Sequence, residues 1–137
     1  MRLLWLTSVV ACAVALSAVA FAAEPGTVAN GSTMLFTVAA VPGMTAEQRA
    51  DGIQKRLVEI LSRIRKGEDP GVVVETGKGA PTISVRGILL VTITSRDCAL
   101  HKCRPDALAK LWGNRVSTRL RIIAPDTSKG AQRTWGD

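Results

Sequence analysis

Residues 45–66 read TAEQRADGIQKRLVEILSRIRK, and this stretch decides the fold because it predicts a long amphipathic helix. Thr45 and Gln48 have the spacing of a capping box, which starts a helix. Charged residues occupy the other faces and are expected to face solvent: Arg49, Lys55, Arg56, Glu59, Arg63 and Arg65. Gly52 predicts a close packing contact, since glycine inside a helix otherwise costs stability. The apolar residues form one stripe at the helical period: Ile53, Leu57, Ile60, Leu61 and Ile64.

Short apolar and β-branched runs on either side of this helix predict strands. The runs occupy residues 33–38, 72–76, 82–85 and 88–94. Arg86-Gly87 joins the last two and suits a tight hairpin turn, because glycine readily adopts a positive φ.

A second helix is expected from Pro105 to about Arg121, since proline fits the first position of a helix. Residues 95–104 are expected to form a connection before this helix. The predicted inner face of the second helix consists of Leu108, Leu111, Trp112, Val116 and Leu120.

The predicted order is therefore β-α-β-β-β-α. Two amphipathic helices can both bury their stripes if they lie side by side on one sheet. We expect an α+β fold, a two-layer sandwich with an antiparallel sheet of about four strands and both helices on one face. This domain would span residues 33–123, between a flexible leader at 23–32 and a disordered tail at 124–137.

Residues 1–22 have the pattern of a secretory signal peptide. A short basic start, an apolar middle and a small-residue site at Ala20-Phe21-Ala22 follow one another. Two alternatives stay open. The uncharged run at residues 3–23 is long enough for an uncleaved membrane anchor, and Cys12 loosely fits a lipid-modification site. The expected location is periplasmic or secreted.

The chain after residue 22 is basic, with 17 Lys and Arg against 11 Asp and Glu, a formal charge of +6. Such a balance favours anionic neighbours. The candidate face for an anionic surface lies on the second helix and consists of Lys110, Arg115, Arg119 and Arg121. Phe36, Trp112 and Trp135 are too few aromatic residues for a nucleic-acid stacking platform, so no nucleic-acid partner is expected.

Cys98, His101 and Cys103 form the one cluster of reactive residues. In an oxidising compartment, Cys98 and Cys103 are predicted to form a disulfide. A zinc site that includes His101 and a redox-active pair are the alternatives, although neither has its usual spacing. His101 otherwise reads as an exposed loop residue. No catalytic motif is present, so we expect no enzyme and no cofactor.

Four segments resemble one family when they are taken in order. Residues 35–38 read LFTV, residues 47–57 EQRADGIQKRL, residues 90–97 LVTITSRD and residues 105–112 PDALAKLW. This series resembles the extracytoplasmic N-terminal domain of bacterial mechanosensitive-channel-like membrane proteins. Because no pore helices follow, the resemblance implies a stand-alone sensing or interaction domain and does not imply channel activity.

The expected function is therefore that of an exported, non-enzymatic interaction or sensing module of the bacterial cell envelope. Its expected partner is an envelope or membrane protein, or an anionic lipid surface. The alternative function is that of a small extracytoplasmic redox or metal-binding protein that uses Cys98, His101 and Cys103.

Overall fold

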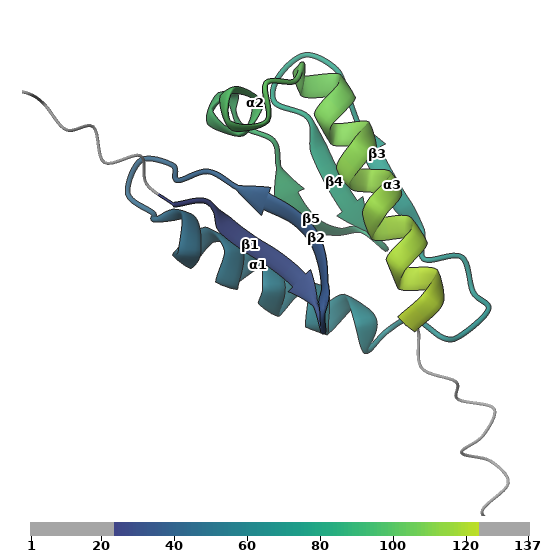
Figure 1. Cartoon of the computed structure of the whole chain (residues 1–137). Coiled ribbons are helices and arrows are strands. Elements are labelled where there is room, and N and C mark those ends of the chain that lie inside the picture. The colour runs from purple at the N-terminus through teal and green to yellow at the C-terminus, as the bar shows by residue number, and fades with distance from the viewer. Residues whose placement is uncertain (1–23, 124–137) are drawn as a thin grey trace, which may run out of the picture.

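The computed structural model describes residues 24–123 (Figure 1). The predicted signal peptide and the predicted tail at 124–137 lie outside the described residues. Within residues 24–123, no helix combines the length and the apolar character needed to cross a membrane. The elements, in chain order, are β1 (Gly26–Asn30), β2 (Thr33–Val38), α1 (Ala46–Leu61), β3 (Val72–Glu75), β4 (Thr82–Val85), β5 (Ile88–Thr92), α2 (Ser95–His101) and α3 (Pro105–Ile123).

This arrangement confirms the α+β fold class, with a different strand layout. The strands form two antiparallel sheets, β1-β2 and β3-β4-β5, in place of one sheet of about four strands. Helix α1 packs against β1, β2 and β5, whereas α3 packs against β2, β3 and β4. In Figure 1, α1 lies beneath the β1-β2 hairpin and α3 runs along the three-stranded sheet.

Strand β1 corrects the expectation of a flexible leader at residues 23–32. Pro25, Gly26 and Gly31 gave this segment the composition of a loop. Tertiary pairing overrides that composition, because β1 pairs antiparallel with β2, with a register shift after Val28, and places Val28 opposite Phe36. Val28 is fully buried, so the segment belongs to the core.

Helix α1 begins as predicted, and both hydrogen bonds of the Thr45–Gln48 capping box are present. It ends at Leu61, earlier than the predicted Lys66. After Leu61 the chain forms a tighter turn, in which the Ile64 amide donates to the Leu61 carbonyl, three residues back. This turn still directs Ile64 into the core, where the residue is buried.

The hairpin between β4 and β5 confirms the predicted turn. Arg86 and Gly87 have φ values of 50° and 78°, and two consecutive positive angles are the pattern of a type I′ turn. The segment after β5 differs from the prediction, because α2 forms within the expected connection. Thr94 caps α2 through a second capping box with Asp97.

Helix α3 starts at Pro105 as predicted and buries Trp112 completely. The Trp112 ring stacks on Phe36 of β2 with ring centroids 4.5 Å apart. The expectation for Leu111 is wrong, because this side chain lies exposed on the flank of α3. The successive 100° steps of a helix place Leu111 beside the buried stripe and not within it.

The close glycine contact lies in α3 and not in α1. A side chain at Gly52 would meet only the end of the Arg56 side chain at 3.7 Å, so the contact predicted there is absent. At Gly113, an added methyl group would overlap the Val74 side chain. Gly113 therefore allows α3 to approach β3 closely.

Candidate functional site

Side chains from three helices close the edge of β2 that faces away from β1. Carbonyls of alternate residues on this edge and directly after it accept hydrogen bonds: Leu35 from Arg115 at 3.3 Å, Thr37 from His101 at 2.8 Å and Ala39, the residue after β2, from Arg49 at 2.9 Å. An uncovered strand edge is a template for pairing with another chain. Because these side chains already donate to the carbonyls, the edge is not free to pair with another strand. The same contacts fix all three helices to β2.

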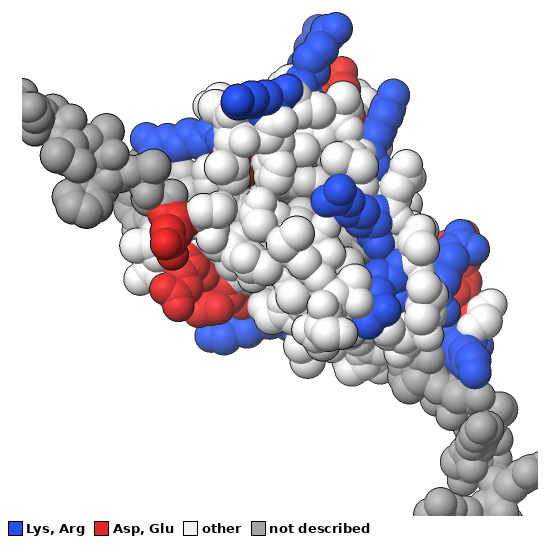
Figure 2. All heavy atoms as spheres, in the orientation of Figure 1, with Lys and Arg blue, Asp and Glu red and all other residues white. Residues whose placement is uncertain are grey.

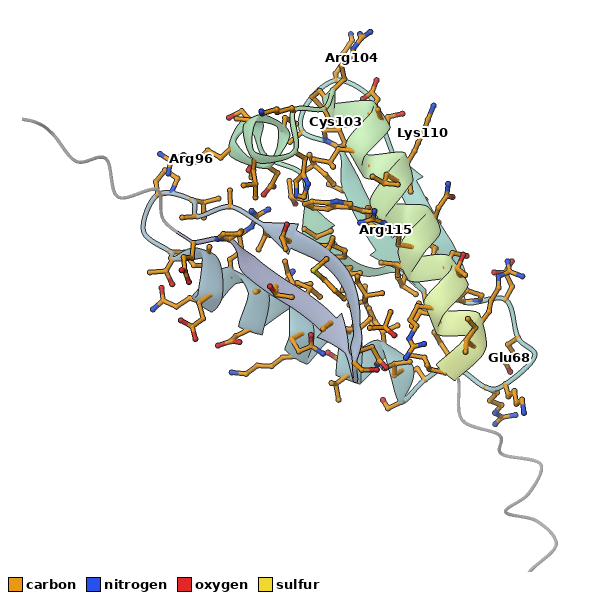
Figure 3. The ribbon with its side chains drawn as sticks, in the orientation of Figure 1. Glu68, Arg96, Cys103, Arg104, Lys110 and Arg115 are labelled. Carbon is orange, nitrogen blue, oxygen red and sulfur yellow. The ribbon has the colours of Figure 1, made fainter. Side chains whose placement is uncertain are left out.

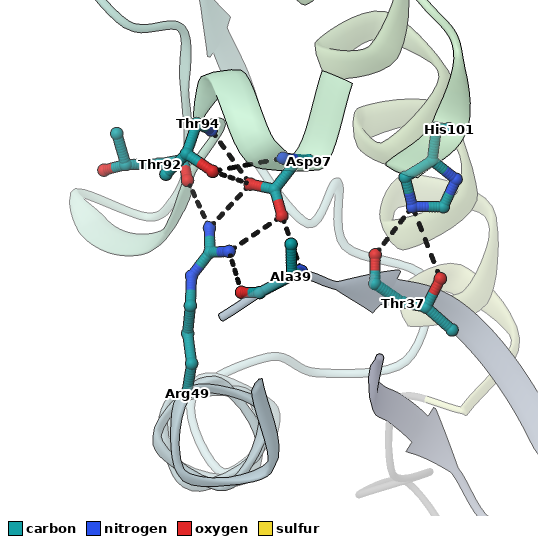
Figure 4. A network of polar contacts seen from close by, with 7 residues as sticks. All are labelled: Thr37, Ala39, Arg49, Thr92, Thr94, Asp97 and His101. Carbon is teal, nitrogen blue, oxygen red and sulfur yellow. Dashed lines mark hydrogen bonds and ion pairs between the residues drawn. The ribbon is translucent and has the colours of Figure 1, made fainter. Parts of the chain in front are cut away.

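Arg49 is the centre of the most buried part of this edge, which corrects the expectation that it faces solvent. Arg49 is 8% exposed, and its guanidinium forms two hydrogen bonds of 2.8 Å with Asp97, which is fully buried (Figure 4). It also donates to the Thr92 carbonyl at the end of β5. Arg49 thus joins the ends of both sheets.

The Asp97 carboxylate is held by five hydrogen bonds. Besides the two from Arg49, it accepts from the Ala39 amide and from the amide and hydroxyl of Thr94. Burial alone would raise the pKa of Asp97, but the hydrogen bonds from Arg49, Ala39 and Thr94 outweigh burial and hold this pKa below its ordinary value. The Asp97 carboxylate is therefore ionised at neutral pH, and its oxygens already accept hydrogen bonds that hold the fold together.

Cys98 and Cys103 stand at the two ends of the C-terminal cap of α2. Lys102 adopts a left-handed conformation, and the Cys103 amide donates to the Cys98 carbonyl at 3.1 Å, as in a Schellman motif. Both thiols are free, and both pack against the core. In this motif the two residues at these positions normally contact each other. The predicted disulfide between them stays a prediction.

Burial, the nearby Asp97 charge and Cys103 raise the pKa of the Cys98 thiol. A raised pKa lowers the thiolate fraction, and thiolate is the form that attacks disulfides and binds metals. His101, expected in an exposed loop, is half-buried and turned toward Thr37 and the Trp112 ring. Among residues 24–123, no three His, Cys, Asp or Glu side chains could together hold a metal ion.

The predicted basic face of α3 divides into two sides. Arg115 and Arg119, one helical turn apart, both reach toward the β1-β2 hairpin, where they donate to the carbonyls of Leu35 and Asn30. Lys110 points away from that hairpin (Figure 3). Three helical turns separate Lys110 from Arg121, so the two lie on the same side of α3. The four residues therefore do not form one continuous surface.

A groove of about 560 Å³ lies between the start of β2 and the outer flank of α3. Three of its apolar side chains are strongly exposed: Met34 at 58%, Leu111 at 44% and Ile122 at 66%. The remaining lining residues are polar or basic, and they are Thr33, Asn114, Arg115, Thr118 and Arg119. No acidic side chain lines the groove within the described part of the chain.

The arginines of this groove, Arg115 and Arg119, keep hydrogen-bonding capacity. Each is held in place by one hydrogen bond of 3.3 Å to a backbone carbonyl, whereas a guanidinium carries five N–H donors. Arg119 Nε is buried and has no hydrogen-bond partner among residues 24–123. We call these two arginines and the exposed Met34, Leu111 and Ile122 the α3 groove. Of these five, the sequence had indicated only the arginines as candidates.

The comparisons with known proteins give one family. A family model described as a domain of unknown function (DUF8459) matches residues 27–122. This match begins in β1 and ends in the last turn of α3, so it covers both sheets and all three helices. No curated protein and no solved structure gave a significant match.

Proposed function

We propose that this chain, which belongs to the DUF8459 family, is an exported, non-enzymatic interaction module of the bacterial cell envelope. The observation that carries the proposal is the α3 groove. It combines exposed apolar side chains with two arginines that are held in place by hydrogen bonds to backbone carbonyls. Exposed apolar groups in a concave site with a few oriented polar groups are typical of a binding surface.

The chemistry of the groove supports binding over catalysis. Its lining contains no His, Cys, Asp or Glu within the described residues, so the usual general acids and bases are missing from it. The carboxylate with the lowered pKa, Asp97, is fully buried and paired with Arg49. The lowered pKa of Asp97 therefore comes from this structural ion pair and does not mark a catalytic group.

The leader sequence at residues 1–22 supports export. The resemblance to the extracytoplasmic domain of mechanosensitive-channel-like proteins supports a membrane protein of the envelope as the partner. The alternative of a redox or metal-binding protein receives less support, because His101 is turned toward Thr37 and the pKa of the Cys98 thiol is raised.

Photo-crosslinking in living cells tests this function. A photoreactive amino acid replaces Leu111 in the α3 groove or, as a control, Val58, which is similarly exposed on α1. We expect a discrete crosslinked product from position 111 only, in the extracytoplasmic fraction. The same product from both positions would contradict the proposal, as would recovery of the intact protein, with its leader, from the cytosol.

A further inference from the structure

We infer that the α3 groove binds a short, acidic, extended segment of its partner protein. This inference rests on the proposed function and names the chemistry of the partner. The groove carries positive charge. Arg115 and Arg119 lie one helical turn apart on the same wall, and no acidic residue within residues 24–123 lines the groove to neutralise them. Guanidinium groups pair with carboxylates through two parallel hydrogen bonds, so carboxylates one turn apart fit this wall.

The distribution of charge over the molecule supports the same ligand. In Figure 2, Lys and Arg side chains predominate along α3, with smaller acidic groups near its two ends, whereas the largest group of Asp and Glu lies over the start of α1. An acidic ligand is therefore attracted to the α3 side and repelled from the α1 side. A basic ligand would instead be attracted to the α1 side and repelled from the α3 side.

The polar part of the lining favours a peptide over a lipid chain. Thr33, Asn114 and Thr118 present hydrogen-bonding groups along the groove. A hydrocarbon chain would cover these groups without a partner, which costs free energy. A peptide backbone offers an N–H and a C=O at each residue and can satisfy them. The apolar residues Met34, Leu111 and Ile122 then contact apolar side chains of the same segment.

The length of the groove limits the segment. From Leu111 to Ile122, α3 rises by about 16 Å at roughly 1.5 Å per residue. An extended peptide advances about 3.3 Å per residue, so about five residues fill the groove. Side chains of an extended segment alternate between two sides. The matching pattern has acidic residues on the side of the arginines and an apolar residue toward Met34 or Ile122.

The mode of binding is side-chain recognition and not addition of a strand to β2. On the edge of β2 that faces away from β1, the Leu35 carbonyl already accepts from Arg115, and the Thr37 carbonyl from His101. A strand added along β2 would have to displace both side chains. The segment is therefore expected to lie against α3 and to contact β2 only at Thr33 and Met34.

Selection from displayed random seven-residue peptides tests the inference, with the full-length protein as bait. We expect the selected peptides to be enriched in Asp and Glu and to carry at least one large apolar residue. A selected peptide, made synthetically, should bind about tenfold more weakly at high salt, because exposed charge pairs are screened. A selected pool without acidic enrichment would overturn the inference.

Two variants locate the binding. Thr118→Glu adds a negative charge at an exposed groove position and should weaken binding of the selected peptide roughly tenfold or more. Val58→Glu adds the same charge at an exposed position on α1 and should leave binding unchanged. Neither position is buried, so both variants should fold. Equal binding by the two variants would place the peptide elsewhere and refute the inference.

Sedimentation with vesicles that contain anionic phospholipid separates a membrane from a protein segment. Vesicle binding that Thr118→Glu abolishes, without any selected acidic peptide, would refute the peptide and favour a lipid headgroup. The crosslink from position 111 is a separate readout. If the crosslink forms but the peptide selection fails, the proposed function stands and only the ligand class is wrong.

Discussion

The guanidinium of Arg49 and the carboxylate of Asp97 form two hydrogen bonds of 2.8 Å, although 48 residues separate them in the chain. The same guanidinium donates to the carbonyls of Ala39 and Thr92, which follow β2 and end β5. All four hydrogens on the two terminal nitrogens are thus used. One ion pair connects α1, α2 and the ends of the two sheets.

Removing one member of this pair should strongly destabilise the fold. In Asp97→Ala, Arg49 keeps its charge in a buried site and loses its counter-ion. We expect the free energy of unfolding to fall by about 3–5 kcal/mol. Urea unfolding followed by circular dichroism measures this change.

The exposed pair of Arg63 and Glu59 serves as the control for the ion-pair variant. These side chains are 58% and 52% exposed, and they lie one turn apart on α1. Arg63→Ala should cost less than about 1 kcal/mol, because solvent screens exposed pairs. Equal losses from the two variants would show that burial does not set the strength of the Arg49–Asp97 pair.

Stability should depend on pH through Asp97. Because its pKa is lowered in the folded state, the unfolded chain binds more protons near the ordinary pKa of about 4, and stability rises with pH in that range. The contribution of Asp97 is complete above about pH 4 and is lost as the pH falls through the lowered pKa. Urea midpoints measured from neutral pH downward should therefore differ most between the wild type and Asp97→Asn at neutral pH. A difference that stays constant down to about pH 2 would contradict this assignment.

Cys98 and Cys103 should form a disulfide when the protein is exported. The bond joins the two Sγ atoms and releases two protons and two electrons, which pass to a disulfide-bearing oxidoreductase or to dioxygen. Closing this loop should raise the free energy of unfolding by roughly 2 kcal/mol. Intact mass with and without reductant detects the bond, and unfolding curves measure its effect.

A variant with both cysteines changed to serine is the control for the disulfide. Its stability should not respond to reductant. Full reaction of both thiols with an alkylating reagent, in protein taken from the oxidising compartment, would show that the disulfide is absent.

Two glycine substitutions should act in opposite directions. Gly113→Ala places a methyl group against the Val74 side chain and should destabilise the fold by about 1–3 kcal/mol. In Gly52→Ala the new methyl group meets only the Arg56 side chain, at an ordinary contact distance of 3.7 Å, so the change should stabilise α1 by up to about 1 kcal/mol. Thermal unfolding of both variants measures the two effects. If Val74→Ala does not reduce the loss in Gly113→Ala, the contact with Val74 is not its cause.

Several elements could be predicted because their signals are local. The capping box at Thr45 and the turn at Arg86-Gly87 lie within a few residues, so the chain near them largely determines the conformation. Strand β1 could not be predicted in this way, since its composition favours a loop and only pairing with β2 makes it a strand. Helix α2 was missed although Thr94 and Asp97 have the spacing of a capping box.

The candidate site was only partly predictable. Arg115 and Arg119 were identified as candidates for an anionic partner, but their separation from Lys110 depends on how α3 packs. Arg49 lies one turn before Ile53 on the apolar stripe of α1, and this position was the signal that it would be buried. The apolar stripe of α1 does not indicate that the partner of Arg49 is Asp97.

The sequence by itself determined the α+β class, the start of α1, the hairpin turn and the basic character of α3. These follow from periodicity, capping and charge, which act between residues close in the chain. The tertiary structure alone decided that Arg49 meets Asp97 and that Met34 lies across a groove from Ile122. The physical reason is that burial and hydrogen-bond satisfaction depend on which distant segments pack together, and no local pattern records that choice.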